Sequence, residues 1–137
     1  MEKSRIKPFL TFNGQAEEAM EFYASVFPGA EITKMVRYGK QSPHIGEDEE
    51  NKVMHGALSL AGGEILFLDM SAANKSLEFS WSSSIYIDCR DETEFDAIFA
   101  GLSKGGFVMM GPEAVGHIRK CAWVTDKFGV TWQPVWE

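Results

Sequence analysis

The chain has 137 residues, of which 45% are hydrophobic, and a formal net charge of −7. That length allows one domain with a buried core and no disulfide or structural metal. The acidic balance argues against nucleic acid as a partner, because phosphate contacts need clustered Lys and Arg. Cys89 and Cys121 lack metal-binding spacing, which indicates reduced, buried thiols. No run approaches the roughly 18 apolar residues of a membrane span, so we expect a cytoplasmic protein without membrane contact.

A strand followed by a helix is predicted at the start of the chain. Residues 7–13 are rich in aromatic and β-branched side chains, and Pro8 suits an edge strand because proline lacks a backbone donor. Asn13 is the expected N-cap of the helix, and Pro28 is the expected stop. Apolar residues at three- and four-residue spacing form the buried stripe of that helix: Ala16, Ala19, Met20, Tyr23, Val26 and Phe27.

Three extended runs complete a first βαβββ module, and they cover 30–38, 52–61 and 64–70. Gly62 and Gly63 are the expected tight turn between the last two runs. The segment 39–51 has the composition of a loop. It contains His44, expected to be exposed, and the acidic stretch Glu47–Glu50, expected to be solvated rather than to bind metal.

The same pattern restarts after a polar connector over 71–82. Residues 83–89 form the expected strand, and Asp91 with Glu94 has the capping-box spacing that begins a helix. The apolar stripe of that helix is Phe95, Ile98, Phe99 and Leu102. The remaining extended runs cover 107–110, 118–125 and 130–136.

A fixed offset between the two halves supports an internal repeat. A shift of 76 places Tyr23 on Phe99 within the two helical stripes. A shift of 66 later in the chain places Leu58 on Val124, because the loop of the first half is longer. Few residues are identical, so the repeat is one of structure rather than of sequence.

These patterns predict an α+β fold made of two βαβββ modules. The modules cover 5–70 and 83–137, joined by the connector 71–82 within a single domain over 1–137. Each module alone would leave one face of a four-stranded sheet uncovered. We therefore expect the two to form a curled, cup-like, eight-stranded mixed sheet with the helices outside.

Three strings of the chain, taken in order, resemble a known family. They are FLTFNGQAEEAMEFYASVFPG, MHGALSLAGGEILFLDM and WVTDKFGVTWQPVW. They are similar to the bacterial PhnB-like (demethylubiquinone methyltransferase-like) family of the vicinal oxygen chelate superfamily, which includes glyoxalases and bleomycin-resistance proteins. The resemblance implies a homodimer and a small-molecule ligand held in the cup.

The resemblance also implies where a metal centre would lie. In metal-dependent members of the superfamily the ligands come from four strand positions, which correspond here to Pro8, Phe67, Ser84 and Gln133. Proline and phenylalanine cannot bind a metal, and a serine and a neutral amide are poor substitutes for imidazole or carboxylate. We therefore expect no metal and no other cofactor.

Strand alternation predicts a pocket lining of apolar side chains with a few polar ones. The predicted lining is Leu10, Phe12, Phe67, Asp69, Tyr86, Asp88, Thr131 and Gln133, with His55 added from the third strand. The alternative is that these side chains fill a collapsed cup.

His55 is the one candidate for catalysis. It shares its strand face with Ala57 and Ser59, and an imidazole can act as a donor or a general base at neutral pH. A hydrogen-bonded structural histidine is the alternative. A zinc site built from His55, Asp69 and His117 would be chemically sensible, but the spacing of these residues does not show that they converge.

Three functions remain open on the sequence. The first is a protein that binds a small, partly apolar molecule without a metal. The second is a lyase, isomerase or thiol transferase that uses a displaced metal site. The third is a dimeric interaction module with a filled cup. Methyl transfer is not expected, because the glycine pairs do not follow a parallel strand as in a nucleotide-binding turn.

Overall fold

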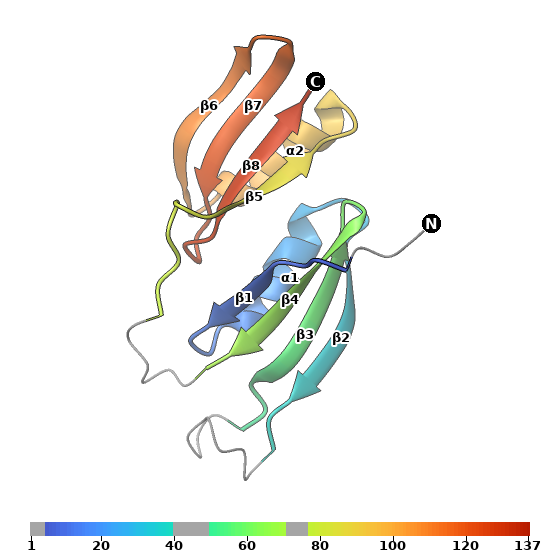
Figure 1. Ribbon diagram of the computed structural model, residues 1–137, viewed down its shortest axis with the longest axis vertical. Coiled ribbons are helices and arrows are strands. Elements are labelled where there is room, and N and C mark those ends of the chain that lie inside the picture. Colours follow the sequence, from blue (N-terminus) through green and yellow to red (C-terminus); the bar gives the residue numbers. More distant parts are fainter. Residues whose placement is uncertain (1–4, 40–49, 71–76) are drawn as a thin grey trace. The chain divides into compact units, whose positions relative to one another are not determined.

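The computed structural model describes residues 5–39, 50–70 and 77–137. The chain divides into two compact units. Unit 1 is Met1–Ala24 with Gly29–Leu77, and unit 2 is Ser25–Pro28 with Glu78–Glu137. Each unit has one four-stranded sheet and follows the βαβββ order, which confirms the predicted α+β class and its two modules (Figure 1). The cup that both modules would form together stays a prediction.

Parts of the predicted loop and connector, 40–49 and 71–76, lie outside the described residues. The predictions for His44 and for the acidic stretch up to residue 49 fall there as well. Neither helix in the described part of the chain is long and apolar enough to cross a membrane.

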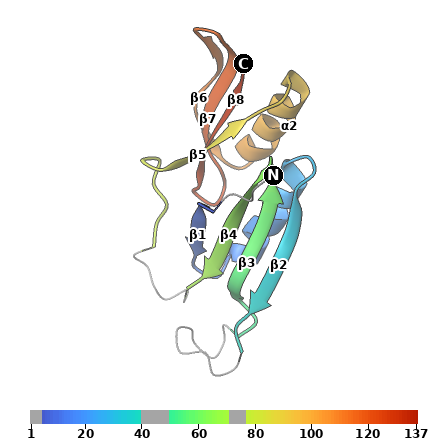
Figure 2. The same cartoon turned by 45° about the vertical axis from the view of Figure 1, so that its right-hand side comes forward.

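Unit 1 places its helix on one face of a mixed sheet. Its elements are β1 (Phe9–Phe12), α1 (Ala16–Val26), β2 (Glu31–Arg37), β3 (Val53–Leu60) and β4 (Gly63–Asp69). The strand order is β1-β4-β3-β2, and β1 is parallel to β4 at the predicted edge. Figures 1 and 2 show α1 lying across one face of this sheet. The first part of the predicted stripe packs there: Tyr23 is fully buried, with its ring 6.1 Å from that of Phe67.

Asp69 holds the start of α1, a role that the sequence assigned to Asn13. The carboxylate of Asp69 accepts hydrogen bonds from the backbone N–H of Ala16 (2.9 Å) and of Val53 (3.0 Å). The carbonyl oxygen of the Asn13 side chain is buried and has no hydrogen-bond partner among the residues that the structure describes. The N-cap prediction was therefore wrong, because a buried carboxylate from the end of β4 reaches the helix start.

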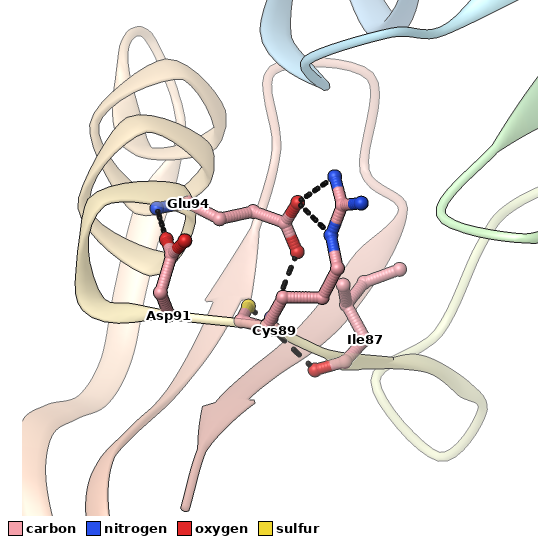
Figure 3. A network of polar contacts seen from close by, with 5 residues as sticks. Ile87, Cys89, Asp91 and Glu94 are labelled. Carbon is pink, nitrogen blue, oxygen red and sulfur yellow. Dashed lines mark hydrogen bonds and ion pairs between the residues drawn. The ribbon is translucent and has the colours of Figure 1, made fainter.

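Unit 2 repeats this arrangement. Its elements are β5 (Ser84–Asp88), α2 (Glu92–Ser103), β6 (Phe107–Val115), β7 (Ile118–Thr125) and β8 (Thr131–Trp136), in the sheet order β5-β8-β7-β6. Figure 3 shows the predicted cap of α2, in which the Asp91 carboxylate accepts from the Glu94 N–H at 2.8 Å. The Glu94 carboxylate in turn accepts from the backbone N–H of Arg90 at 3.1 Å. The predicted start of α2 at Asp91 is confirmed, although Glu94 accepts from the residue before the N-cap and not from Asp91 itself, as it would in a capping box.

The strand β6 is longer than the predicted run over 107–110. Its pairing with β7 shifts register between Met110 and Glu113, where Gly111 and Pro112 lie. Such irregularities let a strand continue past residues that do not fit a regular ladder. The predicted run ended at Met110, whereas the structure accommodates Gly111 and Pro112 within one strand.

Asp126 organises the turn between β7 and β8. Its carboxylate accepts from the backbone N–H of Phe128 and of Val130, and from the indole N–H of Trp132 at 2.8 Å. The Trp132 side chain is fully buried, with its ring 5.0 Å from that of Phe27 in the same unit. These contacts give the carboxylate of Asp126 a structural role in the turn.

Candidate functional site

The sheet of unit 1 has one face under α1 and one open face. On β3, His55, Ala57 and Ser59 point to the open face, since the alternate residues Gly56 and Leu58 face α1. The pairing of β3 with β4 extends that face, because Ala57 is opposite Leu66 and Ser59 is opposite Glu64.

A hollow of about 520 Å³ lies on this open face. Its lining side chains come from the start of the chain and from three neighbouring strands: Lys7, Thr33, Lys34, His55, Ala57, Ser59, Glu64 and Leu66. A register shift in β2 between Ile32 and Lys34 allows the consecutive residues Thr33 and Lys34 both to line the hollow. Bulges are frequent next to binding sites, because they redirect a side chain.

One ion pair lies within the lining. Lys7 Nζ is 2.7 Å from Glu64 Oε1, and the two side chains are 26% and 22% exposed. Lys34 is exposed and makes no ion pair with any residue that the structure describes. The ring of His55 meets that of Phe9 edge-on, with centroids 6.1 Å apart. The hollow thus combines the ion-paired Lys7, a second lysine without an ion pair to any described residue, an imidazole, and an apolar floor of Ala57 and Leu66.

His55 alone of the predicted lining borders this hollow. Phe12, Phe67 and Asp69 are buried, with 3%, 0% and 1% of their surfaces exposed. Phe67 stacks on Phe12 and packs against α1, and Leu10 pairs with Phe67 on the parallel strand and so shares its face. The predicted face was therefore wrong for these four residues, which belong to the core side of the sheet of unit 1.

The predicted residues of unit 2 do share one face of their sheet. Tyr86 is opposite Gln133, and the Gln133 side chain donates to Ser84 Oγ at 2.7 Å. Thr131 is buried, and its hydroxyl is 2.8 Å from that of Thr125. Asp88 continues this face by alternation, opposite in direction to Ile87 in the core. The contact of a ligand with these residues stays a prediction.

Tyr86 is the most exposed aromatic side chain of this predicted set, at 55%. Partial desolvation of the side chain, followed by the negative charge of Asp88, raises the pKa of Tyr86 above the ordinary value of 10.0. The phenol therefore remains protonated at neutral pH and can donate a hydrogen bond.

The wrong face in unit 1 has its origin in the two hairpins. Leu58 pairs with Ile65, and its counterpart Val124 pairs with Trp132, whereas a shift of 66 from Ile65 reaches Thr131. The second hairpin is thus longer by one position in register. One position reverses the face of every later side chain, so the offset that aligned β3 with β7 misaligned β4 with β8.

The sequence did not indicate the polar residues that surround His55, namely Lys7, Thr33, Lys34 and Glu64. A signal for Glu64 was present, because His55, Ala57 and Ser59 were already placed on one face. Extending that face across a tight two-residue turn pairs Ser59 with Glu64 and Ala57 with Leu66.

The positions implied for a metal do not fit one. Phe67 is buried against α1. The side-chain amide of Gln133 donates a hydrogen bond to Ser84, so these two predicted positions contact each other. Among the described residues no group of three His, Cys, Asp or Glu could hold a metal ion. The alternative zinc set also fails, because Asp69 points to the α1 side of the sheet whereas His55 points to the open side.

The fold and the sequence motifs define the class of protein. The chain has the fold of a glyoxalase/bleomycin resistance protein from Albidiferax ferrireducens, with a TM-score of 0.60 and 15% identity over 98% of this chain and 99% of that one. This likeness shows that the paired βαβββ modules of the chain have the fold of that class of protein.

The particular family follows from the sequence. Residues 4–135 match the 3-demethylubiquinone-9 3-methyltransferase family, and the chain belongs to it. A PhnB protein from Bacillus cereus, described under the same activity, is 35% identical, with a TM-score of 0.83 over 98% of this chain and 100% of that one. Protein YjdN from Escherichia coli is 25% identical over 138 residues, covering 93% of this chain and 91% of YjdN.

Proposed function

We propose that this protein binds a small, partly apolar molecule on the open face of the unit 1 sheet, without a metal centre. The hollow beside His55 carries the proposal. Its volume of about 520 Å³ falls in the range of about 300–1,000 Å³ that is usual for small-molecule sites. Its lining joins the apolar surface of Ala57 and Leu66 to hydroxyl, ammonium and imidazole groups.

The description of the family names a methyl transfer, which we do not propose for this chain. A donor-nucleotide site normally uses a glycine-rich turn that leads from a parallel strand into a helix. Here Gly62 lies in the β3–β4 hairpin, and Gly105 follows the end of α2. The residues thus support binding more directly than methyl-group chemistry.

Filling the hollow tests the proposal. A small-molecule library is screened against the protein by thermal shift, and each hit is titrated into ¹⁵N-labelled protein by NMR. Ser59→Leu extends an apolar side chain into the hollow and is expected to weaken every hit that binds there at least about tenfold. The matched control is Ser84→Leu on the sheet of unit 2, which is expected to leave affinity unchanged.

The outcome separates the proposed site from its competitors. Hits that respond only to Ser84→Leu would move the site to the predicted lining of unit 2. A library without hits would favour the dimeric interaction module over the binding protein. No observation in the described residues favours the metal-dependent enzyme, since no set of side chains converges as a metal site.

We also propose that the protein acts as a homodimer in the cytoplasm. The dimer is supported by the resemblance to its superfamily. The compartment is supported by the two free, buried cysteines, which suit a reducing environment. Light scattering coupled to gel filtration measures the mass, and a monomer at micromolar concentration would contradict the dimer.

A further inference from the structure

We infer that the hollow of unit 1 selects a compact oxyanion, a carboxylate or a phosphonate, attached to a small apolar body. The inference rests on the proposed function and adds the chemical class of the ligand. It starts from the charges that line the hollow, which are two lysines against one glutamate. That local balance is opposite to the balance of the chain, which has 13 Lys and Arg against 20 Asp and Glu.

The two lysines differ in what they leave for a ligand. Lys7 already has a counter-ion, because its ammonium lies 2.7 Å from the Glu64 carboxylate. Lys34 has no ion pair with a described residue, although the β2 register shift places it on the hollow opposite Ala57. A bound anion would serve as the counter-ion of the Lys34 ammonium, with which no described carboxylate forms an ion pair.

The neighbours of Lys34 suit an oxyanion as well. The hydroxyls of Thr33 and Ser59 and the imidazole of His55 can each donate a hydrogen bond into the hollow. The Thr33 hydroxyl donates to the Ala57 carbonyl at 3.4 Å, which is long for a hydrogen bond, so a charged acceptor could take its place. Leu66 and Ala57 supply the apolar floor against which the body of the ligand would lie.

The Lys7–Glu64 pair sets the selectivity. The Glu64 carboxylate repels a second negative charge and holds the Lys7 ammonium, so a monoanion is preferred over a polyanion. Removing the Glu64 charge should therefore release Lys7 to the ligand and strengthen anion binding. Such a gain would not result from damage to the fold.

Matched probes test the inference by NMR titration of the ¹⁵N-labelled protein. Phenylacetate and benzylphosphonate carry the anion, phenylacetamide is the neutral analogue of the same shape, and phenethylamine carries the opposite charge. Affinities are read from the backbone amide signals of β3 and β4. We expect phenylacetate to bind at least about tenfold more tightly than phenylacetamide, and to weaken as NaCl rises from about 20 to about 500 mM. Because the Glu64 carboxylate repels a second negative charge, we expect phenylacetate to bind more tightly than benzylphosphonate, which carries more than one negative charge above neutral pH.

Variants tie the charge preference to the named residues. Lys34→Met is expected to lower the affinity for phenylacetate about five- to tenfold and to leave the affinity for phenylacetamide unchanged. Lys104→Met, an exposed lysine after α2, is the control and should change neither. Glu64→Gln is expected to strengthen phenylacetate about threefold or more.

Two results would overturn the inference and are distinguishable from each other. Equal binding of phenylacetate and phenylacetamide, both lost in Ser59→Leu, would remove the charge preference and keep the proposed site. Absence of any shift in β3 and β4 with all four probes would also reject the anion. The proposed function would then depend on the library hits and their response to Ser59→Leu.

Discussion

Replacing the buried carboxylate of Asp69 by an amide tests how unit 1 is held together. Asp69 is 1% exposed, and its two oxygens accept from the N–H groups of Ala16 and Val53 at 2.9 and 3.0 Å. One residue thereby joins the end of β4 to the start of α1 and the start of β3. In Asp69→Asn one of these acceptors becomes an NH₂ group that faces a backbone donor.

The expected cost of Asp69→Asn is about 1–3 kcal/mol in the free energy of unfolding. A buried donor left unpaired costs about that amount, and the neutral amide recovers part of it by avoiding the burial of a charge. Urea denaturation followed by circular dichroism measures the difference. Asp88→Asn, at an exposed position of β5, is the matched control and should change stability by less than about 0.5 kcal/mol. Equal stability of the two variants would refute the role of Asp69.

The pH dependence of the same pair of proteins has a defined sign. Burial is the largest influence on Asp69 and raises the pKa of its carboxyl above 3.8, against the hydrogen bonds from the backbone of Val53, Ala16 and Gly14. The folded state thus holds this proton more tightly than the unfolded chain does. The resulting stabilisation is complete below the unfolded pKa of about 3.9 and is lost as the pH rises through the folded pKa.

Asp69→Asn does not titrate at this position. The loss in free energy of unfolding relative to the wild type should therefore be larger near about pH 3.5 than at about pH 7. Parallel urea titrations across this range measure the deficit. A deficit that grows with rising pH would show that the backbone donors, rather than burial, dominate the titration of this carboxyl.

Three further predictions concern packing, thiol chemistry and metal content. Gly106→Ala would place a Cβ against the backbone carbonyl of Thr125 and should cost about 2–4 kcal/mol in urea, whereas Gly63→Ala, whose nearest atom is 3.8 Å away, should cost less than about 1 kcal/mol. Burial raises the pKa of Cys89 to about 11 and also raises the pKa of Cys121. Both thiols should therefore react with Ellman's reagent at about pH 8 far more slowly in the folded protein than in urea. A reaction rate in the folded protein equal to the rate in urea would contradict their burial. Protein purified without a histidine tag should contain far less than one metal ion per chain by mass spectrometry and keep its melting temperature in chelator, and stoichiometric zinc, manganese or nickel would overturn the metal-free proposal.

The elements of the fold were predictable because their signals are local. The stripe from Ala16 to Phe27 identified α1, and the Asp91–Glu94 spacing identified the start of α2, since both depend on residues within one or two turns of helix. Asn13 shows the limit of such reasoning. A local residue suited the cap, but the carboxylate of Asp69 from a distant strand reached the helix start instead.

The site was less predictable because its members are joined only through strand pairing. Lys7 and Glu64 are far apart in sequence and meet at 2.7 Å. Lys34 enters the hollow through a register shift that no residue in β2 announces. The sequence alone grouped His55 with Ala57 and Ser59, but without the register of β4 it placed Phe67 in the pocket.

The paired βαβββ modules, their helices and most of their strands were determined by the sequence itself, because hydrophobic period, caps and turns act over a few residues. Only the tertiary structure decided which face of each sheet is open. That choice depends on the length of a hairpin to within a single residue, and one residue exchanges core and surface along a whole strand. In this protein it moved Phe67 and Asp69 into the core and brought Lys7, Lys34 and Glu64 together around His55.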